Sequence, residues 1–266
     1  MPSLVIDLSH HNVIPESLIG AKKQGVVGVI HKATESLSYV DSKLQARRSM
    51  VRDAGLLWGV YHFIRPADPV AQAEFFVSTC TRLGVHDDNT LWALDYEDER
   101  VSLGDCIRFM KRMEQLTGKA PILYSGHVLK EKVEGLAPAV SDLTKYRLWL
   151  THYNPKPKLP QGWKDYWLWQ YTDKGYITGI NGHVDLNAYD GTPEQLAEEW
   201  SGSLEKPAPK PDPEPANPPE KPKQVVIVMD VEAPEGTNVK IFVTGMGDVR
   251  VESNIDPLPI TPTGKV

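Results

Sequence analysis

Strand-like and helix-like segments alternate regularly through roughly the first 190 residues, and this alternation restricts the fold more than any other feature. The eight candidate strands are LVID (4–7), VVGVIHK (26–32), LLWGVYHF (56–63), LWALDYE (91–97), PILYS (121–125), RLWLTHY (147–153), YWLWQY (166–171) and HVDLN (183–187). The helix-like segments between the early strands end at Gly25, Gly55, Gly84 and Gly118, where a left-handed cap residue is expected. A helix between consecutive strands implies parallel pairing. Eight such strands most simply close into an α/β barrel.

The later connections are too short, or too rich in proline as in NPKPKLPQG (154–162), to hold a full helix in every gap. We therefore expect an irregular β/α barrel of the TIM type, with eight strands and about five helices. An open doubly wound sheet is the alternative, but it would normally require helices over both faces throughout. No glycine-rich phosphate-binding turn follows the first strand.

A proline-rich segment marks the clearest domain boundary. Of the 18 residues from 206 to 223, 8 are proline and most of the others are charged, which favours an extended spacer over a packed core. The sequence then returns to β-type patterning, in a piece of about 43 residues that is marginal as an independent fold. We predict a barrel domain at 1–202, a linker at 203–223 and a small β-rich C-terminal module at 224–266.

Composition argues against several classes of partner and cofactor. The formal net charge is −6 and there is no stripe of Lys or Arg, so we expect no nucleic-acid binding. Cys80 and Cys106 each lie in a helix-like segment, and His10 and His11 lack the i, i+4 spacing of a helical metal site. We therefore expect no metal and no other cofactor. No run approaches about 18 apolar residues and the N-terminus lacks a signal-peptide pattern, so we expect no membrane insertion and no secretion signal.

Carboxylates and aromatic side chains recur where the candidate strands end, which is where parallel barrels place their functional groups. These strand-end residues are Asp7, Tyr61, His62, Phe63, Asp95, Glu97, Tyr124, Trp149, Trp169, Tyr171 and Asp185. Carboxylates interleaved with aromatic rings indicate a site for a polar ligand that has apolar faces, and sugars have that character. Alternation along 166–171 places Trp167 and Trp169 on one face and Gln170 on the other, so only one of the two faces can line such a site.

The segment LDYE (94–97) carries the most informative pair of carboxylates. Asp95 and Glu97 are two residues apart, so on a strand their side chains project to the same side with Cα atoms roughly 6.5 Å apart. Two carboxyl groups crowded in a partly dry site cannot both ionise easily, and one is pushed towards the protonated form that a general acid needs. Glycosidic bond cleavage uses paired carboxylates of this kind. Asp98 and Glu99 lie past the strand, where we expect ordinary solvated residues.

Six motifs in order resemble those of glycoside hydrolase family 25, the Chalaropsis-type lysozymes. They are VIDLSHHN (5–12), YHF (61–63), LDYE (94–97), WLTHYN (149–154), WQYT (169–172) and GHVDLNAYDG (182–191), so the resemblance runs across roughly residues 3–191. It implies a flattened, irregular β/α barrel. It also implies an N-acetylmuramidase that hydrolyses the β-1,4 bond between N-acetylmuramic acid and N-acetylglucosamine in bacterial peptidoglycan.

The resemblance further implies roles for individual residues. Glu97 would be the general acid, and Asp95 would assist it by orienting the 2-acetamido group of the substrate or by stabilising positive charge. Asp7 and Asp185 would complete the acidic floor of the site. The implied substrate-binding residues are Tyr61, Phe63, Tyr124, Trp149, Tyr153, Trp169 and Tyr171. Whether the configuration at the sugar is retained or inverted stays open, because that outcome depends on the separation of the carboxylates.

Two other functions stay open at this point. A chitinase-like glycosidase would require acidic residues two, four and seven positions before its catalytic Glu, and this sequence has Ala93 and Thr90 at the last two of these positions. A non-catalytic cell-wall sugar-binding barrel would have no need of a proton donor such as Glu97.

The missing secretion signal also bears on origin and location. A lysozyme without one suggests a phage endolysin, held in the host cytoplasm until it is released to the cell wall. The C-terminal module would then serve wall attachment by added valency, or self-association.

Overall fold

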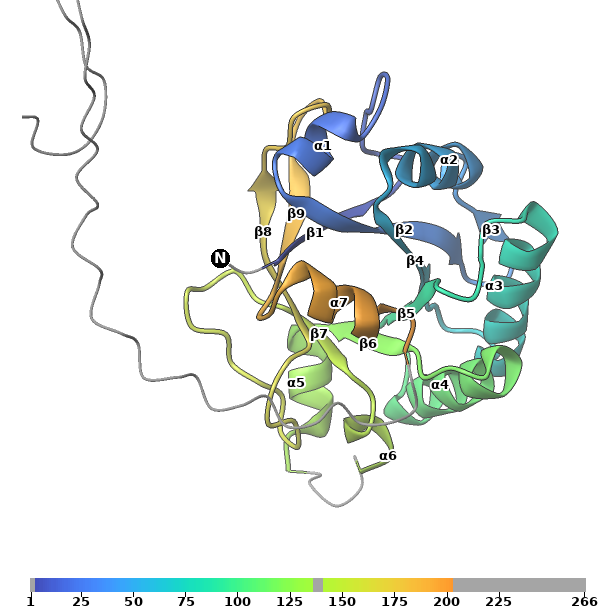
Figure 1. The fold of residues 1–266 in the computed structure, drawn as a ribbon. Helices are drawn as coiled ribbons and strands as arrows, with labels where there is room; N and C mark the ends of the chain where they lie inside the picture. Colours follow the sequence, from blue (N-terminus) through green and yellow to red (C-terminus); the bar gives the residue numbers. More distant parts are fainter. Residues whose placement is uncertain (1–2, 136–140, 203–266) are drawn as a thin grey trace, which may run out of the picture. The chain divides into compact units, whose positions relative to one another are not determined.

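The structure, a computed structural model, describes residues 3–135 and 141–202 (Figure 1). The predictions for the linker at 203–223 and the module at 224–266 lie outside the described residues. Within the described part, no helix is long and apolar enough to cross a membrane.

Eight strands close into a barrel, as predicted. The described residues form nine strands in all, which are β1 (Ser3–Leu8), β2 (Val26–Glu35), β3 (Tyr39–Val40), β4 (Leu57–Phe63), β5 (Leu91–Asp95), β6 (Ile122–Ser125), β7 (Leu148–Thr151), β8 (Leu168–Gly175) and β9 (Val184–Tyr189). The order around the barrel is β1-β9-β8-β7-β6-β5-β4-β2, and pairing between β1 and β2 closes it. The short strand β3 pairs only with β2 and lies outside the ring.

One barrel strand runs against the others. All neighbouring barrel strands pair in parallel except β9, which is antiparallel to both β8 and β1. The connection from 176 to 183 is a hairpin loop, too short for the crossover that a parallel strand requires. The expectation that Asp185 lies at the carboxyl end of its strand is therefore wrong, because Asp185 is the second residue of β9. The reversal nevertheless brings it to the barrel end where the parallel strands finish.

The described residues form seven helices, and five of them have seven residues or more. They are α1 (Ile19–Lys23), α2 (Leu44–Ala54), α3 (Pro69–Leu83), α4 (Leu103–Thr117), α5 (His127–Val133), α6 (Ser141–Thr144) and α7 (Pro193–Trp200). The expected left-handed caps are present after the three longest helices, where Gly55, Gly84 and Gly118 have φ of 63°, 63° and 67°. Helices α2, α3 and α4 lie outside the barrel wall, beside the strands that they connect (Figure 1).

Helix α7 contributes to the apolar core inside the barrel. Trp200 packs among interior residues such as Val5 and Leu91, and its Nε1 donates a hydrogen bond of 2.7 Å to the carbonyl oxygen of Trp58. A Cβ at Gly28 would lie 2.7 Å from the Trp200 ring, so the close approach requires glycine there. These contacts fill the half of the barrel where the strands begin, and the polar side chains gather at the other end.

Candidate active site

Four carboxyl groups from three strands meet at the end of the barrel where the parallel strands finish, which we name the carboxylate end. Asp7 on β1 lies directly opposite Asp185 on β9, and the two side chains share a hydrogen bond. Asp95 is the last residue of β5, and Glu97 follows two residues later. Asp7 and Asp95 are 7% and 6% exposed, whereas Glu97 and Asp185 are half-buried. The structure thus brings together the four acidic residues that the sequence singled out.

Burial dominates the electrostatics of this cluster. Desolvation raises the pKa of Asp95 well above its usual range, and the nearby Glu97 charge raises it further, while Lys32 opposes the shift. Desolvation also raises the pKa of Glu97, with His127 acting in the opposite direction. Oδ1 of Asp95 is buried without a hydrogen-bond partner among the described residues. Because a buried carboxylate oxygen normally has a partner, this atom is available to a donor on a ligand.

Asp7 and Asp185 hold a proton between them at neutral pH. Burial raises the pKa of Asp185 to about 8, and the neighbouring Asp7 adds to the shift. The hydrogen bond that joins the two carboxyl groups requires that one of them be protonated. The pair therefore carries about one negative charge in place of two.

Two buried amides hold Asp7, and neither was among the predicted site residues. Nε2 of Gln170 on β8 and Nδ2 of Asn187 on β9 each donate a hydrogen bond of 2.9 Å to Oδ2 of Asp7. Oδ1 of Asn187 accepts a bond of 2.6 Å from Nε1 of Trp149. These hydrogen bonds partly offset the effect of burial on the pKa of Asp7, which stays raised.

Gln170 also gathers three hydroxyl groups at its Oε1 atom. Tyr124 on β6 lies 3.0 Å away, Thr151 on β7 lies 2.8 Å away, and Tyr153 just beyond β7 lies 3.0 Å away. An amide oxygen has two lone pairs, so the three hydroxyls compete for it. Tyr124 has a second acceptor in Glu97, and that hydrogen bond lowers the pKa of Glu97. Because the Tyr124 hydroxyl has one proton, it donates either to Gln170 or to Glu97, and it lies between the two groups.

Several of the predicted aromatic residues reach the carboxylate end. Tyr61 on β4 lies beside the acidic cluster, since the charges of Asp95 and Asp7 contribute to its raised pKa after desolvation. Tyr124 is 8% exposed, and Tyr153 is 53% exposed. Phe63 at the end of β4 has the Lys32 ammonium 5.2 Å from its ring centroid. These four are placed where a ligand of the carboxylates could meet them.

Three other predicted aromatic residues are placed differently. Trp149 is only 2% exposed and its ring packs 4.5 Å from that of Tyr124, so it supports the site from beneath and offers no open surface to a sugar. Trp169 directly precedes Gln170 on β8, so alternation places its side chain on the opposite face, away from the barrel interior. Tyr171 follows Gln170 where the pairing of β8 with β9 shifts register, and its ring centroid lies 5.8 Å from that of Trp169. The alternation noted in the sequence was the signal for this, because either Gln170 or Trp169 had to face inward.

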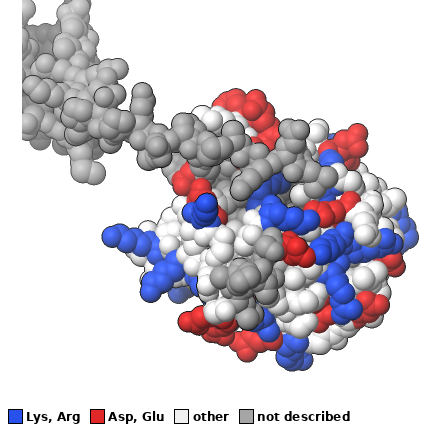
Figure 2. Space-filling view, turned by 90° about the horizontal axis from the view of Figure 1, so that it is seen from below, with Lys and Arg blue, Asp and Glu red and all other residues white. Residues whose placement is uncertain are grey.

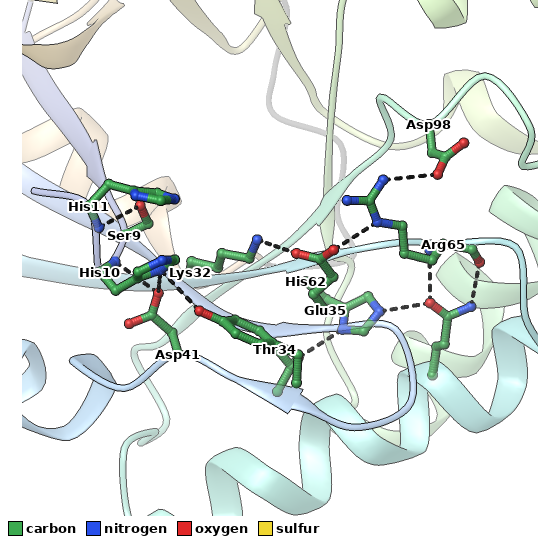
Figure 3. Close-up of polar contacts among 12 residues, drawn as sticks. Ser9, His10, His11, Lys32, Thr34, Glu35, Asp41, His62, Arg65 and Asp98 are labelled. Atoms are coloured by element: carbon green, nitrogen blue, oxygen red, sulfur yellow. Dashed lines mark hydrogen bonds and ion pairs between the residues drawn. The ribbon is translucent and has the colours of Figure 1, made fainter.

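A chain of ion pairs runs along the carboxylate end from β2 to the loop after β5 (Figure 3). Nζ of Lys32 lies 2.5 Å from Oε2 of Glu35, whose Oε1 accepts a bond of 2.8 Å from Nε of Arg65. Arg65 in turn lies 3.1 Å from Asp98. Asp98 also receives Nη2 of Arg100 at 2.6 Å, and it is 7% exposed.

The expectation that Asp98 is a solvated residue is therefore wrong. Hydrogen bonds from Arg100 and Arg65 hold the pKa of Asp98 well below its usual range. The chain turns after β5 so that this carboxylate meets two arginines, one of them from the loop after β4. Glu99, by contrast, is exposed as expected.

The histidines at this end make ordinary polar contacts. Nδ1 of His10 lies 3.0 Å from both Asp41 and the Tyr39 hydroxyl (Figure 3). His62 is buried between Thr34 and Gln72, and burial lowers its pKa to about 4, so it is neutral at pH 7. Among residues 3–135 and 141–202, no group of three or more His, Cys, Asp or Glu side chains could hold a metal ion. On the face shown in Figure 2, basic and acidic side chains are interspersed.

Comparison with known proteins gives concordant matches. Residues 6–180 match the sequence model of a family described as glycosyl hydrolases family 25. The Escherichia coli O157:H7 protein named "Uncharacterized protein YegX" is 33% identical over 188 residues, which cover 66% of this chain and 64% of that protein. The autolytic lysozyme of Clostridium acetobutylicum is 31% identical over 174 residues, which cover 63% of this chain and 50% of the relative. The matched region thus spans at most about two thirds of the length of these relatives.

A solved structure shows the same fold. The family GH25 lysozyme of Aspergillus fumigatus superimposes with a TM-score of 0.63 at 26% sequence identity. The superposition covers 76% of this chain and all of that chain (100%).

Proposed function

The chain belongs to glycosyl hydrolases family 25, and from that premise we propose that it is a lysozyme. Specifically, we propose an N-acetylmuramidase that hydrolyses the β-1,4 bond between N-acetylmuramic acid and N-acetylglucosamine in bacterial peptidoglycan. The observation that carries the proposal is the meeting of Asp7, Asp95, Glu97 and Asp185 at one end of the barrel, with aromatic side chains beside them. The relatives named as lysozymes support the same reaction class.

Glu97 is the proposed proton donor. It is the more exposed member of the Asp95–Glu97 pair, so it is the one that can reach the leaving oxygen of a bound sugar. In the free protein, burial raises the pKa of both Asp95 and Glu97. Because the two groups interact, they share a proton as a pair, and substrate contacts decide which of them carries it.

The unpartnered Oδ1 of Asp95 supplies that contact. An acetamido N–H that donates to this atom stabilises the carboxylate form of Asp95 and lowers its pKa. The shared proton then moves to Glu97, where it protonates the glycosidic oxygen as the bond breaks. The negative charge on Asp95 stabilises the positive charge that develops at the sugar.

Asp7 and Asp185 together add about one negative charge to the site, where two full carboxylates would add two. Since the pair carries about one negative charge, Glu97 keeps its proton more weakly than it would beside two full carboxylates. The amides of Gln170 and Asn187 fix the position of Asp7 relative to the catalytic pair.

Digestion of purified peptidoglycan by the full chain tests the proposal. New reducing ends should appear, and mass analysis should find muramic acid at each of them. Glucosamine at the new ends would exclude a muramidase and favour a chitinase-like cleavage. Binding without new ends would indicate a sugar-binding barrel. Phage origin, release from the host cytoplasm, and wall binding or self-association through residues 224–266 stay predictions.

A further inference from the structure

The hairpin between β8 and β9 carries an exposed aromatic pair that the catalytic proposal does not use. Gly175 and Val184 form the last registered pair of the two strands, so Tyr176 and His183 lie opposite each other one position further out. Their ring centroids are 4.6 Å apart, and the Tyr176 hydroxyl lies 3.4 Å from Nε2 of His183. Tyr176 is 68% exposed, more than any other large apolar or aromatic side chain among the described residues.

The alternation of side chains sets the face on which this pair lies. A Cβ on Gly175 would lie 2.3 Å from Leu186, and Val184 is buried in the core that surrounds the barrel. Tyr176 and His183 therefore point to the opposite face, which is the face of Asp185. His183 is two residues before Asp185, so their Cα atoms are roughly 6.5 Å apart along an extended chain. The aromatic pair thus stands one step beyond the acidic cluster.

The loop that carries the pair is anchored to the segments around α1. Nδ2 of Asn12 donates to the carbonyl oxygen of His183 at 3.4 Å, and Nε2 of Gln24 donates to that of Tyr176 at 3.2 Å. The backbone of Asn181 also donates to the carbonyl oxygen of Val13 at 2.8 Å. These bonds hold the exposed ring in place before any ligand arrives, which lowers the entropic cost of binding.

We propose that Tyr176 and His183 form a further sugar subsite, which binds a hexosamine ring of the same glycan strand beyond the sugars at the carboxylates. This inference rests on the proposed function. A sugar presents an apolar face of C–H groups that packs on an aromatic ring, and its hydroxyl and acetamido groups can bond the edge of His183. Tyr176 and His183 lie beyond Asp185 on the same face, so a glycan strand bound at the carboxylates would extend over them.

The test uses peptide-free glycan strands, sorted by length, and the full chain with Tyr176→Ala. For strands longer than a tetrasaccharide we expect KM to rise about three- to tenfold with kcat nearly unchanged, because only a remote binding contact is lost. Tetrasaccharide cleavage should be unaffected. Tyr176→Phe keeps the ring, so its KM should equal that of the unaltered chain. The matched control is Leu37→Ala, which removes an exposed apolar side chain in the β2–β3 turn and should leave KM unchanged. An unchanged KM at every strand length would overturn the subsite.

A binding measurement separates this inference from the proposed function. Titration calorimetry on Glu97→Gln with the same strands should show Kd about three- to tenfold weaker once Tyr176→Ala is added. If the unaltered chain cleaves no strand, the proposed function fails, and this Kd comparison still decides the subsite. Absence of binding, or an equal Kd for the two variants, overturns it.

Discussion

Nε2 of Gln170 donates a hydrogen bond of 2.9 Å to Oδ2 of Asp7, joining residues that are 163 positions apart in sequence. The bond crosses the barrel end from β8 to β1, and the same amide accepts from the hydroxyls of Tyr124 and Tyr153. One neutral side chain therefore links Asp7 to hydroxyl groups on β6 and in the segment after β7. Because Gln170 touches no reacting atom, it is a positioning residue in the proposed reaction.

We predict that Gln170→Met lowers kcat about tenfold to a hundredfold, since Asp7 loses one of the two amides that hold it in position. Unfolding free energy should fall by about 2–3 kcal/mol, because buried hydroxyls and a carboxylate lose partners. Gln115→Met, at an exposed site on α4, should change neither. Steady-state kinetics and urea unfolding provide both values.

Gln170→Glu should keep the hydroxyl contacts but place a third carboxyl group beside Asp7. Its pH–rate profile should therefore shift, whereas substitution of a residue with a purely structural role would leave the profile unchanged. A kcat for Gln170→Met equal to that of the unaltered chain would rule out the positioning role.

The carboxylates between residues 95 and 99 should separate into catalytic and solvated members. Glu97→Gln keeps the shape of the side chain but cannot deliver a proton, so turnover should fall about 10²- to 10⁴-fold while the fold survives. Asp95→Asn should also be severe, because it removes the charge that stabilises the developing positive sugar. Glu99→Gln, at an exposed position two residues after Glu97, is the control and should retain activity. Release of reducing ends from one peptidoglycan preparation compares all three. Similar activity throughout would place the active site elsewhere.

Asp98 should matter for stability, contrary to what the sequence suggested. Asp98→Asn removes the charge that pairs with Arg65 and Arg100, so we expect a loss of about 1–2 kcal/mol of unfolding free energy. Glu99→Gln should stay within about 0.5 kcal/mol. Thermal and urea unfolding at pH 7 measure both. The folded state holds the pKa of Asp98 below its usual range, so the stabilisation is present above the unfolded pKa of about 4 and is lost as pH falls. Equal stabilities at pH 7 would contradict this account.

The strands and their order were predictable because alternating side chains and glycine caps are local signals. The reversal of β9 was not read from the sequence, since the pattern of 184–189 is the same in either direction; the short 176–183 connection was the only clue. The inward face of β8 depended on tertiary partners, because a buried Gln170 is tolerated only when Asp7 and nearby hydroxyl groups satisfy its amide. Burial of Asp98 likewise depended on Arg65, which comes from the loop after β4. The local sequence pattern was therefore enough to predict where the carboxylates lie. The polar network around them could be identified only from the three-dimensional structure.

The Asp7–Asp185 pair makes the stability of the barrel depend on pH in a direction opposite to that of Asp98. Burial raises the pKa of Asp185 to about 8, so the folded state binds more protons than the unfolded chain between about pH 4 and pH 8. Stability should therefore fall as pH rises through this window. Asp185→Asn mimics the protonated carboxyl, because its amide can donate to Asp7 without titrating.

We accordingly predict that Asp185→Asn is more stable than the unaltered chain at pH 8, by about 1 kcal/mol once the half-exposure of the side chain is allowed for, with little difference at pH 4. Asp53→Asn, an exposed carboxyl on α2, is the control and should follow the unaltered chain at both values. Urea unfolding from pH 4 to pH 8 supplies the comparison. A variant less stable than the unaltered chain at pH 8 would contradict the prediction. That result would mean that Asp185 is ionised and well stabilised in the folded state.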